Sequence, residues 1–477
     1  MQVSRPGTKH QAITKKIKRL TMTFGFKKHL QPYAARLISS NALLVMKRQW
    51  YESWRKLLKR EHQVDVYLRI NDPYSYLLVQ VLADVERRFD VRLQFKTILN
   101  LQQDMYPEEQ LWHHNAFIDA THLARLYQLD WPEEAPQDER IRAEQASQLL
   151  LQQEAQSLKN QYCDWAAIES VFKNYWFQQA LDSLGDSNDS DPNDSESIVH
   201  SWKDLLRANE LCLAKNGHYM SAMLHYGGEW YWGLDRLDHL ERRLLALGQG
   251  EATEVLFDKT YAQFCQTKPL TQPDPKHKKL VLYFSIRSPY SHLGLQQAIT
   301  LAQHYQLSLD VKPILPMIMR GLSVPNTKKM YIFHDTKREA QKLGIKYGKV
   351  ADPLGEGVNR CYSLFKYAQS QGVGIEYLLN YAQAVNAQGI HSDTDKGLKL
   401  IVERTGLDWA YAQKLLKQDD RDQQWQVWAE DNRQQMLALG SWGVPTYQYG
   451  DLVLWGQDRV GLIEKAILQQ ADSGIVD

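Results

Sequence analysis

The chain has 477 residues, of which 43% are hydrophobic and 24% charged, and its net charge is +1, values ordinary for a globular protein of several domains. It contains no apolar run of about 18 residues, which excludes a transmembrane helix, and no signal-peptide pattern opens it. Its four cysteines, Cys163, Cys212, Cys265 and Cys361, form neither a C-x-x-C pair nor a metal-ligand spacing. We therefore expect a cytoplasmic protein without a metal site, and disfavour a disulfide oxidoreductase.

Residues 1–61 are expected to form a basic helical extension. Residues 1–60 contain fifteen Lys and Arg residues but only one acidic residue, Glu52. From Ala34 to Arg60 apolar residues recur at helical spacing, which predicts one or two amphipathic helices. Such an arm can contact nucleic acid or an anionic membrane. The alternative that we favour is docking on the acidic remainder of the same chain, with the apolar face packed on the main body.

An internal duplication is indicated by two matched blocks that occur in the same order. Pro73-Tyr74-Ser75 aligns with Pro289-Tyr290-Ser291, together with the apolar runs before them, and residues 226–236 align with 449–459. This predicts two units, at 62–248 and 278–472, joined by a linker at 249–277. In each unit a strand, turn, helix and strand precede a long helical segment, two short strands and a last helix. The order predicts an α/β fold with two tandem thioredoxin-like domains, each with an inserted helical subdomain.

The most informative stretch of the second unit is a strand that turns directly into a helix. The apolar run 280–284 predicts a buried strand, Ser288 falls in the turn, and a helical pattern follows from His292 to Ala302. A helix that begins at such a turn directs its first free N–H groups at whatever occupies the turn, which favours an anion. Ser288 cannot exchange disulfides, but its hydroxyl can donate to a thiolate that another molecule brings.

Three runs of the second unit carry a family pattern. They are Ser288 to Ser291, the K-x-x-Y-x-x-x-D-x-x-R-x-A-x-x-x-G run from Lys328 to Gly344, and the G-V-P-T and W-G-Q-D-R motifs within 442–459. The unit thereby resembles 2-hydroxychromene-2-carboxylate isomerases and kappa-class glutathione transferases, which are DsbA-like members of the thioredoxin superfamily. The resemblance covers 278–472, extends in weaker form to 62–248 and does not reach 1–60.

This resemblance implies that the second unit binds glutathione, or a similar low-molecular-weight thiol, as its cofactor. Ser288 would hydrogen-bond and activate the sulfur, in keeping with the stabilisation of a thiolate near a helix N-terminus. Val444, in a predicted cis bond to Pro445, would offer its backbone to the cysteinyl unit.

The two ends of glutathione have implied partners of their own. Gln457 and Asp458 would hold the γ-glutamyl end, and Lys328 would hold the glycine carboxylate. Supporting roles are implied for Tyr290, Ser323, Trp455 and Arg459.

The chain also departs from the family pattern. Where the kappa family has a glutathione-binding asparagine in an Asn-Lys-Pro segment, this chain has Ser323-Val324-Pro325. In the first unit Asp72 takes the position of Ser288, and a carboxylate there would repel a thiolate. Ala222 takes the position of Pro445. We therefore expect the first unit to be a non-catalytic copy that pairs with the second, unless it binds a different ligand.

Each candidate residue also has a purely structural interpretation. Ser288 could simply cap its helix. Asp458 could be a helix-start carboxylate, Arg459 could form a surface ion pair, and Lys328 could be a solvated lysine.

The sequence thus predicts a thiol-dependent isomerase or transferase acting on an electrophilic small molecule. The two repeats would pair within one chain, or the chain would form a homodimer. The alternative is a non-catalytic, duplicated scaffold whose basic arm contacts a membrane or nucleic acid.

Overall fold

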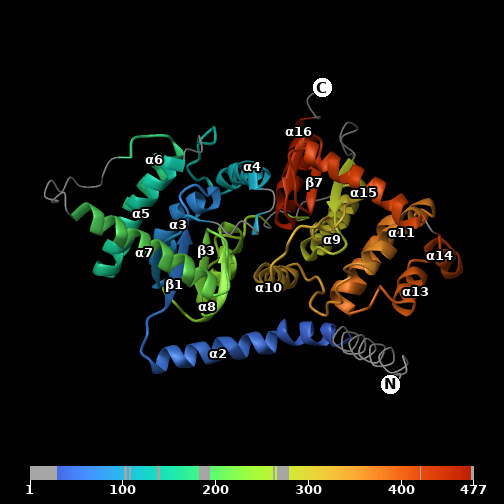
Figure 1. Cartoon of the computed structure of the whole chain (residues 1–477), viewed down its shortest axis with the longest axis horizontal. Coiled ribbons are helices and arrows are strands. Elements are labelled where there is room, and N and C mark those ends of the chain that lie inside the picture. The colour runs from blue at the N-terminus through green and yellow to red at the C-terminus, as the bar shows by residue number, and fades with distance from the viewer. Residues whose placement is uncertain are drawn as a thin grey trace, which may run out of the picture.

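Two mixed four-stranded sheets organise the protein, one in each half of the chain. The computed structural model describes residues 29–100, 105–106, 109–136, 140–181, 194–260, 264–265, 279–418 and 420–473. The strand orders are β2-β1-β3-β4 and β6-β5-β7-β8, and helices surround both sheets (Figure 1). The predicted α/β class with two thioredoxin-like domains is confirmed, and the two sheets support the duplication.

The first unit, from β1 to α8, holds its sheet strands at the two ends of its sequence. Its strands are β1 (Gln63–Leu68), β2 (Arg92–Thr97), β3 (Met223–Tyr226) and β4 (Glu229–Trp232). Its helices are α3 (Pro73–Phe89), α4 (Glu109–Tyr127), α5 (Arg140–Asn160), α6 (Trp165–Trp176), α7 (Asp194–Lys215), the short η2 (Leu234–Arg236) and α8 (Leu237–Ala246). Helices α4 to α7 form the predicted helical insertion between β2 and β3.

The second unit, from β5 to α16, repeats this plan. Its strands are β5 (Lys279–Phe284), β6 (Ser308–Pro313), β7 (Thr446–Tyr449) and β8 (Leu452–Trp455). Its helices are α9 (Pro289–His304), η3 (Met317–Arg320), α10 (Asn326–Lys342), α11 (Glu356–Ser370), α12 (Gly374–Gln383), the π-helical η4 (Ala384–Gln388), α13 (Asp395–Arg404), α14 (Trp409–Leu416), α15 (Arg421–Ala438), η5 (Gln457–Arg459) and α16 (Val460–Ser473). The predicted linker at 249–277 falls partly outside the described residues.

The two sheets share their strand pairing as well as their order. The first strand of each unit pairs in parallel with the second, Gln63 opposite Arg92 and Lys279 opposite Ser308. It then pairs antiparallel with the third strand, which forms a hairpin with the fourth. In both units the parallel connection carries a helix, α3 or α9, that starts at the carboxyl end of the first strand. This edge is where an α/β sheet can present a ligand to a helix N-terminus.

Each unit has its own apolar core, and one core also receives side chains from the other unit. Val66, Leu68 and Phe95 are fully buried in the first core, as Leu282 and Phe284 are in the second. Trp442 and Trp455 of the second unit pack against the first core. The contact between the units is therefore apolar around the end of β8.

The amino-terminal arm crosses both units. Residues 29–38 are helical, and α2 (Asn41–Leu57) follows; Figure 1 shows α2 extended along one side of the molecule. The expectation that its apolar face packs on the main body is wrong. Trp50 is 69% exposed and Leu57 is 71% exposed, because α2 docks instead through the face that carries Arg48, Tyr51 and Glu52. None of the helices in the described ranges is long and apolar enough to cross a membrane.

Candidate functional site

A cavity of about 280 Å³ lies where the two units meet. The second unit contributes most of the residues singled out in its sequence: Ser288, Tyr290, Lys328, Val444, Pro445, Trp455, Gln457, Asp458 and Arg459. The first unit contributes a largely aromatic wall: Tyr74, Tyr106, Trp112, Tyr219 and Trp232. One predicted supporting residue is not brought in: Ser323 is exposed, and its neighbour Val324 lines the cavity instead.

Ser288 occupies the N-cap of α9, at the end of the turn that follows β5. Its Oγ accepts a hydrogen bond of 3.2 Å from the backbone N–H of Ser291. Capping of this kind uses a lone pair of the hydroxyl, so the O–H hydrogen is still available to an acceptor. Pro289 has no N–H, so in this first turn the N–H of Tyr290 is the one left to face a ligand. Ser288 thus caps the helix and can donate into the cavity as well.

The loop before β7 forms the opposite side of this turn. The Val444–Pro445 bond is cis, as predicted. The Pro445 ring packs on α9 so closely that a Cβ built on Gly294 would lie 3.0 Å from its Cβ and Cγ atoms. A Cβ on Gly443 would lie 2.4 Å from Nε1 of Trp455. The two glycines allow the loop to approach the helix and the Trp455 ring.

A buried ion-pair network joins the units beside the cavity. Arg236 of the first unit donates to both Asp335 oxygens at 2.9 Å and to Oδ2 of Asp458 at 2.8 Å. At the equivalent position of the second unit, Arg459 donates to Asp119 at 2.5 and 2.7 Å and to Asp235 at 2.7 Å through two bonds. Each arginine therefore binds two carboxylates of the other unit.

The alternative interpretation of Arg459 as part of a surface ion pair is wrong, because its side chain is buried, as is that of Arg236. Burial alone would raise the pKa of Asp458, but Arg459 and Arg236 outweigh it and hold that pKa below its usual value. The Asp335 carboxyl behaves alike: burial opposes the charge, yet Arg236 and Arg338 lower its pKa. These carboxylates are therefore charged, and each is paired with one arginine of its own unit, Arg338 or Arg459, and with Arg236 of the first unit.

Two further second-unit residues tie the cavity to its surroundings. Tyr290 donates to Oδ2 of Asp335 at 2.8 Å. Burial and that carboxylate raise the pKa of Tyr290 well above its ordinary value, so its hydroxyl keeps its proton. Lys328 donates from Nζ to the backbone oxygen of Met105 in the first unit at 2.6 Å. The solvated-lysine interpretation is therefore wrong.

The first unit keeps the turn but not its chemistry. Asp72 caps α3 by accepting from the N–H of Ser75 at 3.1 Å and from its hydroxyl at 2.7 Å. Ala222, at the position of Pro445, has a left-handed φ of 54°. Tyr74 still donates to Asp119 at 2.9 Å, as Tyr290 does to Asp335. The interactions that both units retain involve Asp119 and Asp335, which bind the arginine of the other unit. The positions that differ, Asp72 and Ala222, are those that would face a thiolate.

The aromatic wall and Arg236 are the parts of the site that sequence reasoning missed. A signal was present, since Tyr74, Trp232 and Arg236 match Tyr290, Trp455 and Arg459 in the repeat. The first unit reads as a degenerate copy, so the sequence predicts no role for its retained residues in the cavity of the second unit. Cys361 is fully buried. Within the described ranges, no cluster of three or more His, Cys, Asp or Glu residues is arranged to hold a metal ion.

Parts of the chain are similar to known proteins. Residues 279–468 match the family described as the DSBA-like thioredoxin domain. The second unit is a DsbA-like thioredoxin domain. The chain is 26% identical over 193 residues to a 2-hydroxychromene-2-carboxylate isomerase of Pseudomonas putida, covering 39% of this chain and 92% of that protein. It is 24% identical over 193 residues to the enzyme of the same name from Pseudomonas sp. strain C18, with 39% and 88% covered.

A solved structure of 2-hydroxychromene-2-carboxylate isomerase also aligns with the chain. The identity is 25%, the TM-score is 0.36, and the alignment covers 42% of this chain and 100% of the other. The relatives therefore match about one unit of this chain each, and the named enzymes are of the isomerase class. The DsbA-like domain here is accompanied by a second thioredoxin-like unit and a basic arm.

Proposed function

We propose that the DsbA-like domain binds glutathione, or a similar thiol, and catalyses its addition to an apolar electrophile or a thiol-assisted isomerisation of that electrophile. The observation that carries this proposal is the position of the Ser288 hydroxyl, at the N-terminus of α9 and beside the cis Val444–Pro445 loop, in a cavity closed by the first unit. The relatives' names support the isomerase version.

The residues present fit a thiol ligand with hydrogen-bonding ends. Two buried donors of the cavity, Oη of Tyr106 and Nε1 of Trp442, have no hydrogen-bond partner among the described residues. Buried polar groups are usually paired, so such groups indicate that something else occupies the cavity during function. Asp458 lines the cavity as well, although an α-ammonium group would share its carboxylate with Arg236.

A bound thiolate supplies a nucleophile for an electrophilic carbon, and it either stays attached or leaves after the substrate has isomerised. The role that we assign to Ser288 is to donate its O–H to the sulfur, which favours the charged form. The N-terminus of α9 adds the field of its dipole. The aromatic wall of Tyr106, Trp112 and Trp232 excludes water from the electrophile and gives it apolar contacts.

Calorimetric titration of glutathione tests the proposal. We expect about one site per chain, and an affinity that Ser288→Ala weakens by about ten- to a hundredfold, as for a hydrogen bond to a charged group. The matched control is Asp72→Asn, which keeps the equivalent cap of the first unit and should leave the affinity unchanged. If Ser288→Ala bound glutathione as tightly as the unaltered protein, the assignment of Ser288 would be wrong.

A further inference from the structure

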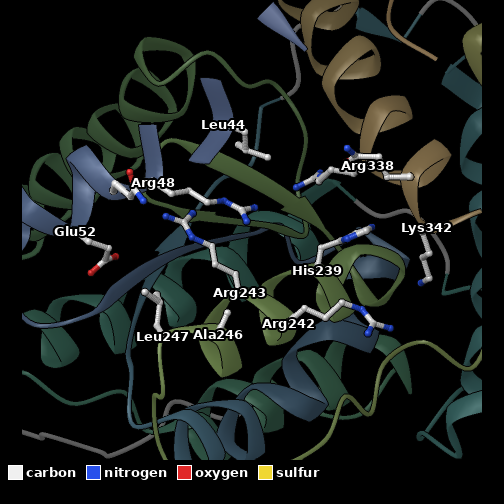
Figure 2. A pocket seen from close by; sticks show the side chains of 12 residues that line it. Leu44, Arg48, Glu52, His239, Arg242, Arg243, Ala246, Leu247, Arg338 and Lys342 are labelled. Carbon is white, nitrogen blue, oxygen red and sulfur yellow. The ribbon is translucent and has the colours of Figure 1, made fainter. Parts of the chain in front are cut away.

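The outward face of α2 carries an apolar stripe that the fold itself holds away from the body. The docked face of α2 is held by polar contacts as well as by the half-buried Tyr51 ring, which packs on the first core. Arg48 donates to both oxygens of Glu229 at 2.8 and 2.7 Å, and Tyr226 donates to Glu52 at 3.0 Å. Figure 2 shows Arg48 of α2 beside Arg243 of α8, which also donates to Glu229. Turning α2 to bury its apolar residues would break these pairs.

The opposite face is formed by Met46, Trp50, Trp54 and Leu57, which we call the outer stripe. Their exposed fractions are 57%, 69%, 50% and 71%. Spacings of four, four and three residues place them on one side of a helix, opposite Arg48 and Glu52. The rings of Trp50 and Trp54 stack with their centroids 6.2 Å apart. A continuous apolar stripe of this kind marks an interaction surface.

The charges around the outer stripe indicate the partner. Lys47 and Lys56 are exposed on α2 itself, and Lys59 and Arg60 are exposed just beyond its last residue. Residues 1–60 as a whole carry fifteen basic residues and one acidic residue, whereas the rest of the chain is acidic. An exposed apolar stripe with tryptophan and a lysine- and arginine-rich rim is the composition of helices that lie in a membrane interface. Tryptophan alone would also suit stacking on nucleic-acid bases, but Met46 and Leu57 would have no role there.

We propose that α2 docks this protein on an anionic lipid surface, with the outer stripe in the boundary between headgroups and acyl chains. The basic rim would then face the anionic headgroups, each lysine or arginine contributing through its charge. The geometry places the lipid on the side of α2 that faces away from both units. This inference is independent of the thiol chemistry proposed for the cavity.

Co-sedimentation of the full chain with vesicles tests the docking. Vesicles of phosphatidylcholine with about one quarter phosphatidylglycerol should bind the protein, and binding should weaken as salt is added because the surface charge is screened. The double variant Trp50→Gln/Trp54→Gln should bind at least about tenfold more weakly, since two large apolar side chains no longer enter the lipid. Lys56→Gln/Lys59→Gln should also weaken binding to the anionic vesicles by about tenfold. The same change should leave any binding to pure phosphatidylcholine vesicles unaltered, because these carry no net charge.

The matched control is Ile141→Gln/Tyr162→Gln, which removes two apolar side chains that are 71% and 66% exposed but lie outside α2. It should bind vesicles as the unaltered protein does, and all variants should keep the unaltered melting temperature. The proposal is overturned if the unaltered protein does not sediment with anionic vesicles. It is equally overturned if Trp50→Gln/Trp54→Gln binds anionic vesicles as tightly as the unaltered protein does. Loss of DNA-oligonucleotide binding or of self-association in that variant, with vesicle binding unchanged, would assign the outer stripe to a different partner and overturn the proposal as well.

Discussion

Arg236 of the first unit donates to Asp458 of the second at 2.8 Å, so the carboxylate next to the proposed thiol site is completed by the other repeat. Arg459 makes the reciprocal contact with Asp235 at 2.7 Å. Interfaces in which the same patch of two copies meets itself are typical of two-fold homodimers. Here the two patches belong to one chain, and the copy without the thiol-site residues supplies part of the wall and the charge around the intact site.

Removing the Arg236 guanidinium should strongly destabilise the contact between the units. Arg236→Gln removes one of the two cations beside each of the buried Asp335 and Asp458 carboxylates, which keep only Arg338 and Arg459. Breaking a buried ion pair typically costs about 3–5 kcal/mol. The free energy of unfolding from urea titrations measures this cost. Arg140→Gln is the control: the Arg140 side chain is 91% exposed, so its ion pair with Glu144 should contribute less than about 0.5 kcal/mol. Equal, small effects of the two changes would contradict the stabilising role of the network.

Adding one methyl group to α9 should disturb the cis-proline loop. In Gly294→Ala the new Cβ would lie 2.9 Å from the Tyr447 hydroxyl and 3.0 Å from the rigid Pro445 ring. Crowding of this kind costs about 1–3 kcal/mol, which exceeds the roughly 1 kcal/mol that alanine gains in helix propensity. We expect lower stability and weaker glutathione binding. Thr300→Ala, at an exposed position of the same helix, should change neither quantity; a fully stable Gly294→Ala would disprove the close approach.

The function of Lys328 can be separated from its contact with the first unit. If Lys328 holds the glycine carboxylate, Lys328→Met should weaken the affinity for glutathione by about tenfold. The affinity for γ-glutamylcysteine, which lacks the glycine residue and its carboxylate, should not change. Competition between the two thiols, followed by calorimetry, measures the difference. An equal loss for both ligands would indicate that Lys328 acts through its bond to the Met105 carbonyl.

Two buried histidines should each cost stability as the pH is lowered from 6.5 towards 4. Burial lowers the pKa of His218 to about 3 and that of His292 to about 4. In this range these two histidines bind more protons in the unfolded chain, where they titrate near a pKa of about 6.5, than in the folded chain. Each histidine should therefore remove about 2 kcal/mol from the free energy of unfolding at pH 5. Urea midpoints at pH 7 and pH 5 test this, and His218→Gln should show a smaller loss; an identical loss would contradict the assignment.

Much of the fold could be predicted from the sequence because the repeat carries its own internal evidence. The match of Pro73-Tyr74-Ser75 to Pro289-Tyr290-Ser291 predicts two units, and two sheets with equivalent pairing are present. The cis bond at Val444–Pro445 was predicted from a family motif and is present. Local patterns of this kind report local backbone geometry, which tertiary contacts rarely change.

The parts that could not be predicted depend on contacts between distant segments. Arg459 reads as a surface residue because nothing near it in sequence shows that Asp119 and Asp235 of the other unit will cover it. The amphipathic pattern of α2 shows that the helix has two faces but not which face docks. The docked face is decided by Glu229 and Tyr226, which lie far along the chain.

The ultraviolet absorbance of bound thiolate, followed as a function of pH, tests the central claim most directly. In the complex with the unaltered protein, the thiol of glutathione should titrate at least about one pH unit below its ordinary pKa of about 8.5. Ser288→Ala should move that pKa back towards the value of free glutathione, and Asp72→Asn should not. A thiol that titrates in the complex as it does in solution, or equally in the Ser288→Ala complex, would contradict the claim that this DsbA-like domain activates a thiolate through Ser288.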